Sequence, residues 1–265
     1  MQWSAPLLAV LAAYLLGSLA FAVIVSKVMG LSDPRTFGSK NPGATNVLRS
    51  GSKPAAIVTL LLDALKGFVP VLLVQRFGHP YGLEEGTMAM VGLAAFLGHL
   101  YPVFFRFEGG KGVATFIGVV FGIHWVLGLA TALTWLIIAF FFRYSSLASL
   151  VSAVFAPVYY LLGDRLQWYA ERPVAVALFA MALLLAWRHR ANIQRLLQGK
   201  ESRLGAKKDA PPPAADHPPH HHHGHRRLSG GGAPIPARSR SASRAAAPRR
   251  CGGPGACRAA PRPPR

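Results

Sequence analysis

Residues 113–142 read VATFIGVVFGIHWVLGLATALTWLIIAFFF, an apolar stretch of 30 residues whose one titratable side chain is His124. A transmembrane helix needs only about 20 residues to cross the hydrocarbon layer of a bilayer. The stretch is therefore either one long tilted helix or two shorter helices broken near Gly122-Ile123-His124. The choice sets how many times the chain crosses a membrane.

Basic residues around the other apolar blocks decide between these alternatives. The blocks cover residues 3–25, 54–74, 86–105, 147–162 and 173–187, and Lys and Arg concentrate at 27–53 and 188–208. One continuous helix would place these two basic segments on opposite sides of the membrane, whereas cytoplasmic loops carry the excess of Lys and Arg. The sequence therefore predicts seven spans, with the N-terminus outside and the C-terminus in the cytoplasm. The fourth, 113–123, is too short to cross as a helix, so we expect it to be broken, tilted or buried among its neighbours.

Composition supports this fold class and divides the chain in two. The 265 residues are 52% hydrophobic and 15% charged, with the apolar residues in blocks, which predicts an all-α membrane protein over residues 1–205. Residues 206–265 carry 12 Lys/Arg against two Asp among Pro, Ala, Gly and His, and we expect a disordered basic tail there. Both cysteines lie in this tail, so we predict no metal centre in the membrane domain, and we expect no nucleic-acid partner.

The first polar motif, GSKNPGATNVLR at residues 38–49, lies between the first two spans. Its Pro and Gly favour turns, and its side chains offer hydrogen-bond donors to an anion: Ser39, Asn41, Thr45, Asn46 and Arg49. The alternative is a loop in which these groups satisfy the local backbone. Five donors in eleven residues favour an anion site.

The second motif runs from Gly98 to Gly112 and ends in Gly-Gly-Lys-Gly. Glycines allow backbone N–H groups to approach an anion closely, and Lys111 adds a point charge at the start of a helix. The run is not a Walker A loop, because no Ser or Thr follows the lysine. Tight turns also use glycine for steric reasons alone.

Two shorter motifs fall on the same predicted face. Ser146 lies in the turn before the sixth span, where it could also cap a helix. His189 and Asn192 follow the last span at a spacing that puts both on one helix face. The basic residues there could equally complement a helix dipole or bind lipid phosphate.

Charges inside the second span need a different explanation. Asp63 and Lys66 are three residues apart, and charges within hydrocarbon are costly unless paired, so we expect an ion pair that supports the site. For His99 and Tyr101, at the inner end of the third span, we favour hydrogen bonds between helices over a place in the pocket.

In this order, the motifs resemble the bacterial acyl-phosphate:glycerol-3-phosphate acyltransferase family over about residues 5–203, including DALKG at 63–67, GGKGVAT at 109–115 and HRANIQR at 189–195. The resemblance implies a seven-helix inner-membrane enzyme without a cofactor. Its reaction would transfer a fatty acyl group from acyl phosphate to the 1-hydroxyl of sn-glycerol 3-phosphate and make lysophosphatidic acid. The resemblance further implies a functional link to the enzyme that supplies acyl phosphate.

The resemblance also assigns roles to residues. It implies catalytic residues Ser39, Arg49, Lys111, His189 and Asn192; substrate-binding residues Asn41, Asn46, Gly109, Gly110, Gly112 and Ser146; and structural support from Asp63, Lys66 and Glu201. His189 is one candidate for the general base, and a substrate phosphate is the other.

Two other classes of protein are alternatives to an acyl-phosphate-dependent acyltransferase. Acyl-CoA-dependent enzymes with a His-x4-Asp pair are disfavoured, because no His here has Asp five positions later. A transporter or channel for small phosphate-bearing anions is the remaining alternative, suggested by the charged pair within a span. Against it, the sequence shows no inverted repeat and gathers its polar motifs on one side.

Overall fold

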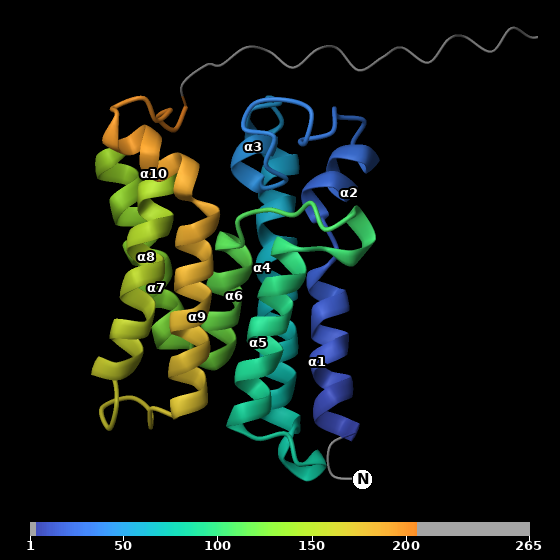
Figure 1. Cartoon of the computed structure of the whole chain (residues 1–265), viewed down its shortest axis with the longest axis vertical. Helices are drawn as coiled ribbons and strands as arrows, with labels where there is room; N and C mark the ends of the chain where they lie inside the picture. The colour runs from blue at the N-terminus through green and yellow to red at the C-terminus, as the bar shows by residue number, and fades with distance from the viewer. Residues whose placement is uncertain (1–3, 206–265) are drawn as a thin grey trace, which may run out of the picture. The chain divides into compact units, whose positions relative to one another are not determined.

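The structure is a computed structural model that describes residues 4–205; the predicted tail at 206–265 lies outside the described residues (Figure 1). In the described part, regular structure is helical apart from an isolated bridge between Asp164 and Trp168. The α-helices are α1 Ser4–Gly17, α2 Phe21–Val28, α3 Ala44–Leu48, α4 Lys53–Phe77, α5 Glu85–Leu100, α6 Val113–Ile123, α7 Trp125–Phe142, α8 Ser145–Leu162, α9 Arg172–Arg188 and α10 Arg190–Leu197, with 3-10 turns at His79–Tyr81 and Val103–Phe105.

The helices confirm an all-α membrane protein. Four of them, α4, α7, α8 and α5 with its continuation to Phe105, are each long and apolar enough to cross a membrane. Two bent pairs pass the same test, α1 with α2 at 45° and α9 with α10 at 61°. Each of the seven predicted apolar blocks thus contains a helix, while the number of crossings and their orientation stay predictions.

The break predicted within residues 113–142 is present at His124. This residue has extended backbone angles, and its Nδ1 accepts the Val126 N–H at 3.3 Å, which caps α7. On the α6 side, Gln75 from α4 donates to the Ile123 carbonyl at 2.7 Å. Polar side chains therefore satisfy the main chain on both sides of the break.

Helix α6 is short but well covered. Its 11 residues rise about 16 Å, well below the ~30 Å of the hydrocarbon layer. It packs closely on α4, because a Cβ atom on Gly118 would lie 1.9 Å from the Ala64 carbonyl oxygen, and one on Gly67 would lie 2.2 Å from that of Thr115. Small residues at such crossings allow helix backbones to approach in a membrane. Of the three expectations for this span, burial among its neighbours describes α6.

The first span differs from the continuous helix expected over residues 3–25, because α1 ends at Gly17 and α2 begins at Phe21. The end of α1 lies against α5, where a Cβ atom on Gly17 would meet the Ala95 carbonyl oxygen at 2.2 Å. Within the break, the Leu19 carbonyl accepts a hydrogen bond from Lys66 Nζ at 2.7 Å. A lysine of α4 thus helps to satisfy the interrupted backbone of the first span.

The predicted Asp63–Lys66 ion pair is present in the interior of α4. The Nζ of Lys66 lies 2.8 Å from Asp63 Oδ1, and the two side chains are 1% and 3% exposed. His99 of α5 extends the cluster, with its Nδ1 3.6 Å from the same oxygen. The pair therefore links α4 with α5 and with the break in the first span.

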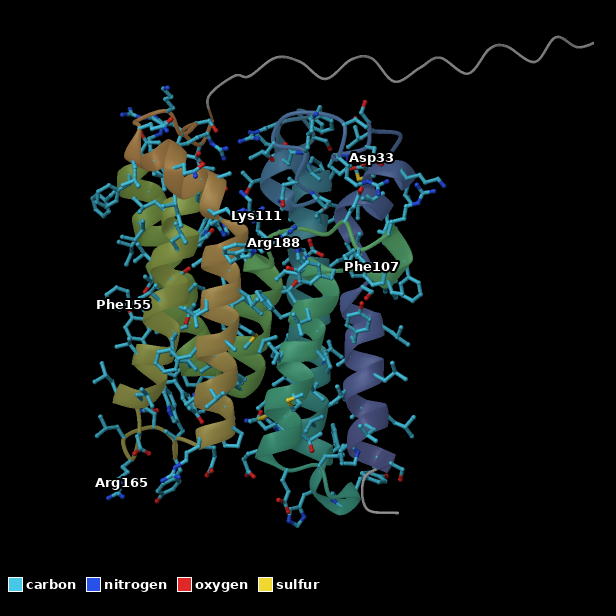
Figure 2. The ribbon with its side chains drawn as sticks, in the orientation of Figure 1. Asp33, Phe107, Lys111, Phe155, Arg165 and Arg188 are labelled. Atoms are coloured by element: carbon cyan, nitrogen blue, oxygen red, sulfur yellow. The ribbon has the colours of Figure 1, made fainter. Side chains whose placement is uncertain are left out.

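The polar motifs share one end of the bundle. Figure 1 shows α3 and α10 at the end away from the N-terminus, and Figure 2 shows Lys111 beside Arg188 on the same side, with Arg165 at the opposite end. This agrees with the prediction of one polar face.

The buried pair generates a prediction for stability. Replacing Lys66→Met leaves the Asp63 charge buried without its partner, a change that costs about 3–5 kcal/mol in proteins and should lower the apparent melting temperature in detergent by roughly 6 °C or more. Adding Asp63→Asn removes the remaining charge and should recover most of this loss. Lys27→Met, at an exposed lysine, is the control. A Lys66→Met protein as stable as its parent would contradict the assignment.

Candidate anion-binding active site

The Glu201 carboxylate connects the polar ends of two helices. It accepts hydrogen bonds from Ser146 Oγ at 2.8 Å, from Asn192 Nδ2 at 2.6 Å and from Arg195 Nε at 2.7 Å. Burial alone would raise the pKa of this carboxyl, but the bonds from Asn192, Arg195 and Ser146 outweigh burial and lower it. An ionised Glu201 therefore fixes α10 against the start of α8. The cap of α8 is Tyr144, so Ser146 does not serve as the cap residue considered for it.

Lys111 joins this network through Asn192. Because the Asn192 amide nitrogen donates to Glu201, its oxygen faces Lys111 and accepts from Nζ. Burial is the main cause that lowers the pKa of the Lys111 ammonium to about 8. Neighbouring cations act in the same direction, namely Arg195, Arg49 and Arg188, whereas Glu201 opposes them. Four cations around one carboxylate leave a surplus of positive charge that favours an anion.

The glycines before Lys111 make contacts within the protein, whereas the sequence predicted that their N–H groups would approach an anion. The Gly110 N–H donates to the His99 carbonyl at 3.1 Å, so it is not available to a ligand. The carbonyls of Gly109 and Gly110 accept from the Arg188 guanidinium at 2.7–3.1 Å. Gly112 has φ +83° at the start of α6, and a Cβ atom there would lie 2.4 Å from the Phe96 ring. Close packing explains the glycines, and their predicted contact with substrate stays a prediction.

Asn46 likewise holds its loop rather than facing a ligand. Its amide nitrogen donates to the carbonyls of Pro34 at 2.6 Å and Phe37 at 3.2 Å. Its oxygen accepts from the Ser39 N–H at 3.1 Å and from Arg49 Nη1 at 3.3 Å. With a side chain that is 2% exposed and bonded at both ends, Asn46 has no polar group left for substrate. Asn46 therefore serves the structure of its loop here, and the substrate-binding role expected for it stays a prediction.

Arg49 brings the first motif to the rest of the site. Its Nη2 donates to Ser202 Oγ at 3.2 Å, next to Glu201 in sequence. Ser39 is exposed, and within the described chain its hydroxyl makes no hydrogen bond, so it remains available to a ligand. Asn41 is partly buried in the same loop.

His189 lies at the junction of α9 and α10 and is 2% exposed. Its Nδ1 is 2.8 Å from the Leu185 carbonyl oxygen. Since a carbonyl can only accept, the neutral ring carries its proton on Nδ1 and keeps a lone pair on Nε2. The contact with the Leu185 carbonyl thus favours the tautomer in which Nε2 is unprotonated.

Hydrogen bonds among the described residues join only part of the predicted site. Lys111, Asn192, Ser146 and Glu201 form one hydrogen-bonded network, which Arg49 reaches through Ser202, while the Asp63–Lys66 pair lies apart within α4. Sequence reasoning missed Arg188 and Ser202. An arginine at the end of a helix can be explained by its interaction with the helix dipole alone. Ser202 lies outside all of the motifs.

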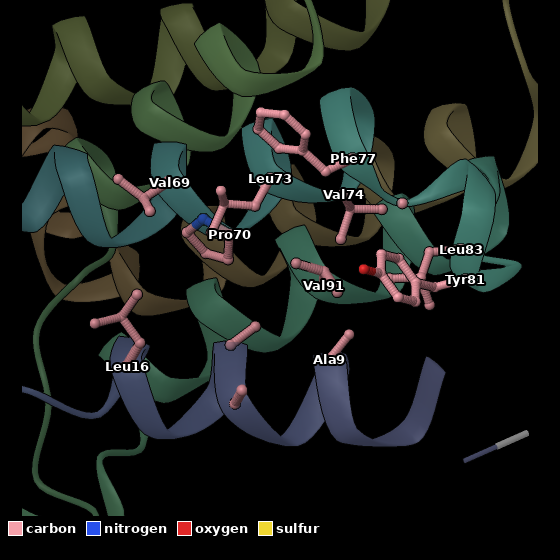
Figure 3. Close-up of a pocket in the computed structure, with 13 residues that line it drawn as sticks. Ala9, Leu16, Val69, Pro70, Leu73, Val74, Phe77, Tyr81, Leu83 and Val91 are labelled. Atoms are coloured by element: carbon pink, nitrogen blue, oxygen red, sulfur yellow. The ribbon is translucent and has the colours of Figure 1, made fainter. Parts of the chain in front are cut away.

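An apolar cavity of about 320 Å³ lies elsewhere in the bundle (Figure 3). Its walls come from α1, α4, α5 and the loop after α4, including Leu16, Leu73 and Tyr81. The segment that joins α4 to α5 lies at the end of the bundle opposite α3 and α10 in Figure 1, so the cavity is not part of this site.

Comparison with known proteins agrees with the geometry. The family model of glycerol-3-phosphate acyltransferase matches residues 7–199. A glycerol-3-phosphate acyltransferase of Albidiferax ferrireducens is 69% identical over 207 residues, covering 78% of this chain and 92% of the relative, and one of Burkholderia pseudomallei is 65% identical over 204 residues, covering 76% and 97%.

Two solved structures are also similar. They are crystal structures of PlsY, an integral membrane glycerol 3-phosphate acyltransferase, in a glycerol 3-phosphate form and a lysophosphatidic acid form. The first has TM-score 0.70 and 41% identity, covering 76% of this chain and 96% of that one. The second has TM-score 0.68 and 40% identity, covering 76% and 95%. On this sequence and structural evidence together, the chain belongs to the glycerol-3-phosphate acyltransferase family.

Proposed function

We propose that the chain transfers a fatty acyl group from acyl phosphate to the 1-hydroxyl of sn-glycerol 3-phosphate, giving lysophosphatidic acid and inorganic phosphate. The observation that carries the proposal is the surplus of positive charge around Lys111, where three arginines surround a partly buried lysine and a single carboxylate. Both substrates carry phosphate, so both need cations. The relatives are named for acyl transfer to glycerol 3-phosphate, and the two forms of PlsY contain that acceptor and lysophosphatidic acid.

The reaction needs alignment and charge neutralisation more than activation. The glycerol hydroxyl oxygen forms a bond with the acyl carbon, the bond from that carbon to the phosphate oxygen breaks, and the phosphate leaves with the electron pair. Acyl phosphate is an activated anhydride, so cations that hold the two phosphates in place and stabilise the oxyanion supply the main catalytic effect. Lys111, Arg49 and the free hydroxyl of Ser39 are suited to this task.

The hydroxyl proton goes to His189 Nε2 in this proposal. The Leu185 carbonyl fixes the tautomer that leaves Nε2 unprotonated. A phosphate oxygen of substrate is the other acceptor, which requires no protein base.

The membrane placement follows from the same charge distribution. We infer a bacterial inner-membrane location, with the N-terminus outside and the polar end in the cytoplasm, because the basic segments gather at that end. Glycerol 3-phosphate would then arrive from the cytoplasm and the acyl chain from lipid. An enzyme that supplies acyl phosphate is the expected functional partner.

Purified protein in detergent should convert acyl phosphate and glycerol 3-phosphate into lysophosphatidic acid and phosphate in equal amounts. Product analysis by mass spectrometry checks the result, with acyl-CoA in place of acyl phosphate as the donor control. Glycerol phosphate that crosses liposomes containing the protein without being acylated would support the transporter alternative instead.

The lowered pKa of Lys111 predicts the dependence on pH. Phosphate binding needs the protonated amine, so KM for glycerol 3-phosphate should rise as pH increases from about 7 to 9 through the pKa of about 8. The phosphate itself is already a dianion there, since its second pKa is about 6. Lys111→Arg stays charged and should abolish this rise, although its rate is lower. Lys53→Arg, outside the site, should retain the rise; an unchanged rise in Lys111→Arg would assign it to another group.

His189→Gln tests the base. Loss of a general base lowers rates about 10²–10⁴-fold, so single-turnover acyl transfer should slow by at least about 100-fold while KM for glycerol 3-phosphate changes little. Retention of most of the rate would remove His189 from this role and leave the substrate phosphate as the acceptor.

A further inference from the structure

The loop that carries Lys111 rests on a buried histidine that the proposed reaction does not use. His99, in the last turn of α5, is 7% exposed. A Cβ atom on Gly110 would lie 2.3 Å from His99 Nε2, and one on Gly109 would lie 2.1 Å from the His99 carbonyl oxygen. That oxygen also accepts the Gly110 N–H at 3.1 Å. Ring and carbonyl of His99 therefore form the surface on which the two glycines lie.

The Asp63–Lys66 pair faces the other side of the same ring. His99 Nδ1 is buried without a hydrogen-bond partner among the described residues, and it lies 3.6 Å from Asp63 Oδ1, the oxygen that is ion-paired with Lys66. A small approach would bring them into hydrogen-bond range, and an unpaired buried polar atom is costly, so the ring is held facing Asp63. Lys66 in turn fixes Asp63 at 2.8 Å and the Leu19 carbonyl at 2.7 Å.

The opposite side of the glycine loop is also held. Arg188 donates to the carbonyls of Gly109 and Gly110, and its guanidinium lies 5.7 Å from the centre of the Tyr101 ring. Lys111 follows these glycines directly and donates to Asn192. Because the loop is clamped between His99 and Arg188, a displaced His99 ring would displace Lys111.

We propose that His99 is a positioning residue for Lys111 and that the Asp63–Lys66 pair serves to hold the His99 ring. This inference rests on the proposed function, since Lys111 acts on the substrate phosphate there. In this proposal the charged pair within α4 orients the His99 ring in addition to linking helices. A misplacement of a catalytic group by about 1 Å can cost about 100-fold in rate.

A double-mutant cycle between His99 and Gly110 tests the contact. Gly110→Ala should lower kcat/KM strongly in the parent protein, because the new methyl group meets the ring. In the His99→Ala background the same methyl group keeps only its 3.0 Å contact with the Pro42 carbonyl oxygen, so its additional cost should be about tenfold smaller, within the coupling expected for residues in contact. Rates are measured per folded protein recovered as a single species in detergent. If Gly110→Ala lowers kcat/KM by the same factor in the parent and in the His99→Ala background, the two residues are not coupled and the proposal is overturned.

Two further variants separate positioning from plain stability. His99→Gln places a polar group near the position of Nε2, and His99→Asn near that of Nδ1. Because Nε2 lies against Gly110, the Gln variant should keep more of kcat/KM than the Asn variant. The Asn variant should also shift the pH at which KM for glycerol 3-phosphate rises, since Lys111 leaves its place. If His99→Ala does not insert, His99→Asn, which has no group at the Nε2 position beside Gly110, takes its place in the cycle.

Thr131→Val provides the matched control, because it removes a fully buried hydroxyl whose bond stays within α7, to the Leu127 carbonyl. It should retain the kcat/KM and pH profile of the parent. Folded His99 variants that also retain both, with only a lower melting temperature, would show a structural role and refute positioning. An inactive parent protein would instead overturn the proposed function, so the two failures are distinguishable.

Discussion

Main-chain polar groups within hydrocarbon must find their partners inside the protein, because no water reaches them. Three interruptions of regular helix in this bundle satisfy that constraint with a side chain from another helix. Lys66 of α4 donates to the Leu19 carbonyl between α1 and α2, and Gln75 of α4 donates to the Ile123 carbonyl at the end of α6. Arg188 of α9 donates to the carbonyls of the glycine loop. Each break is thereby converted into a contact between helices.

This constraint explains which features of the fold could be predicted from sequence patterns. The break at His124 follows from charge counting, and the helix bounds around it agree with the apolar blocks. The pairing of Asp63 with Lys66 follows from their spacing. The break at Leu19 had only a weak local signal, the Gly17-Ser18 pair, because Gly17-Ser18-Leu19-Ala20 contains neither a charge nor a proline. The residue that compensates for this break is Lys66, which is distant in the sequence. Its hydrogen bond to the Leu19 carbonyl depends on tertiary packing alone and could not be predicted from the sequence.

The site shows the same limit. Residue type predicts donors, but distance decides whether a donor serves a ligand or the protein. Asn46 and Gly110 have the right chemistry for an anion, yet their N–H groups donate to the carbonyls of Pro34, Phe37 and His99. From the sequence, Arg188 would be interpreted as a charge that complements the end of a helix. In the structure it instead donates to the loop before Lys111 and fixes it. Sequence reasoning therefore found most of the cluster and could not assign the partner of each donor.

The charge balance of the site follows from the proposed reaction. Two substrates that each carry phosphate repel one another, and a partly buried site screens this repulsion less than water does. Protein cations must therefore exceed protein anions where the substrates meet. Such a surplus has a cost without substrate, and it adds to burial, the main cause, in lowering the pKa of Lys111. Glu201 limits this cost with a single negative charge, and its three hydrogen bonds orient Asn192, Ser146 and Arg195. One carboxylate is enough to order the donors, whereas a second would weaken the field that draws two phosphates together.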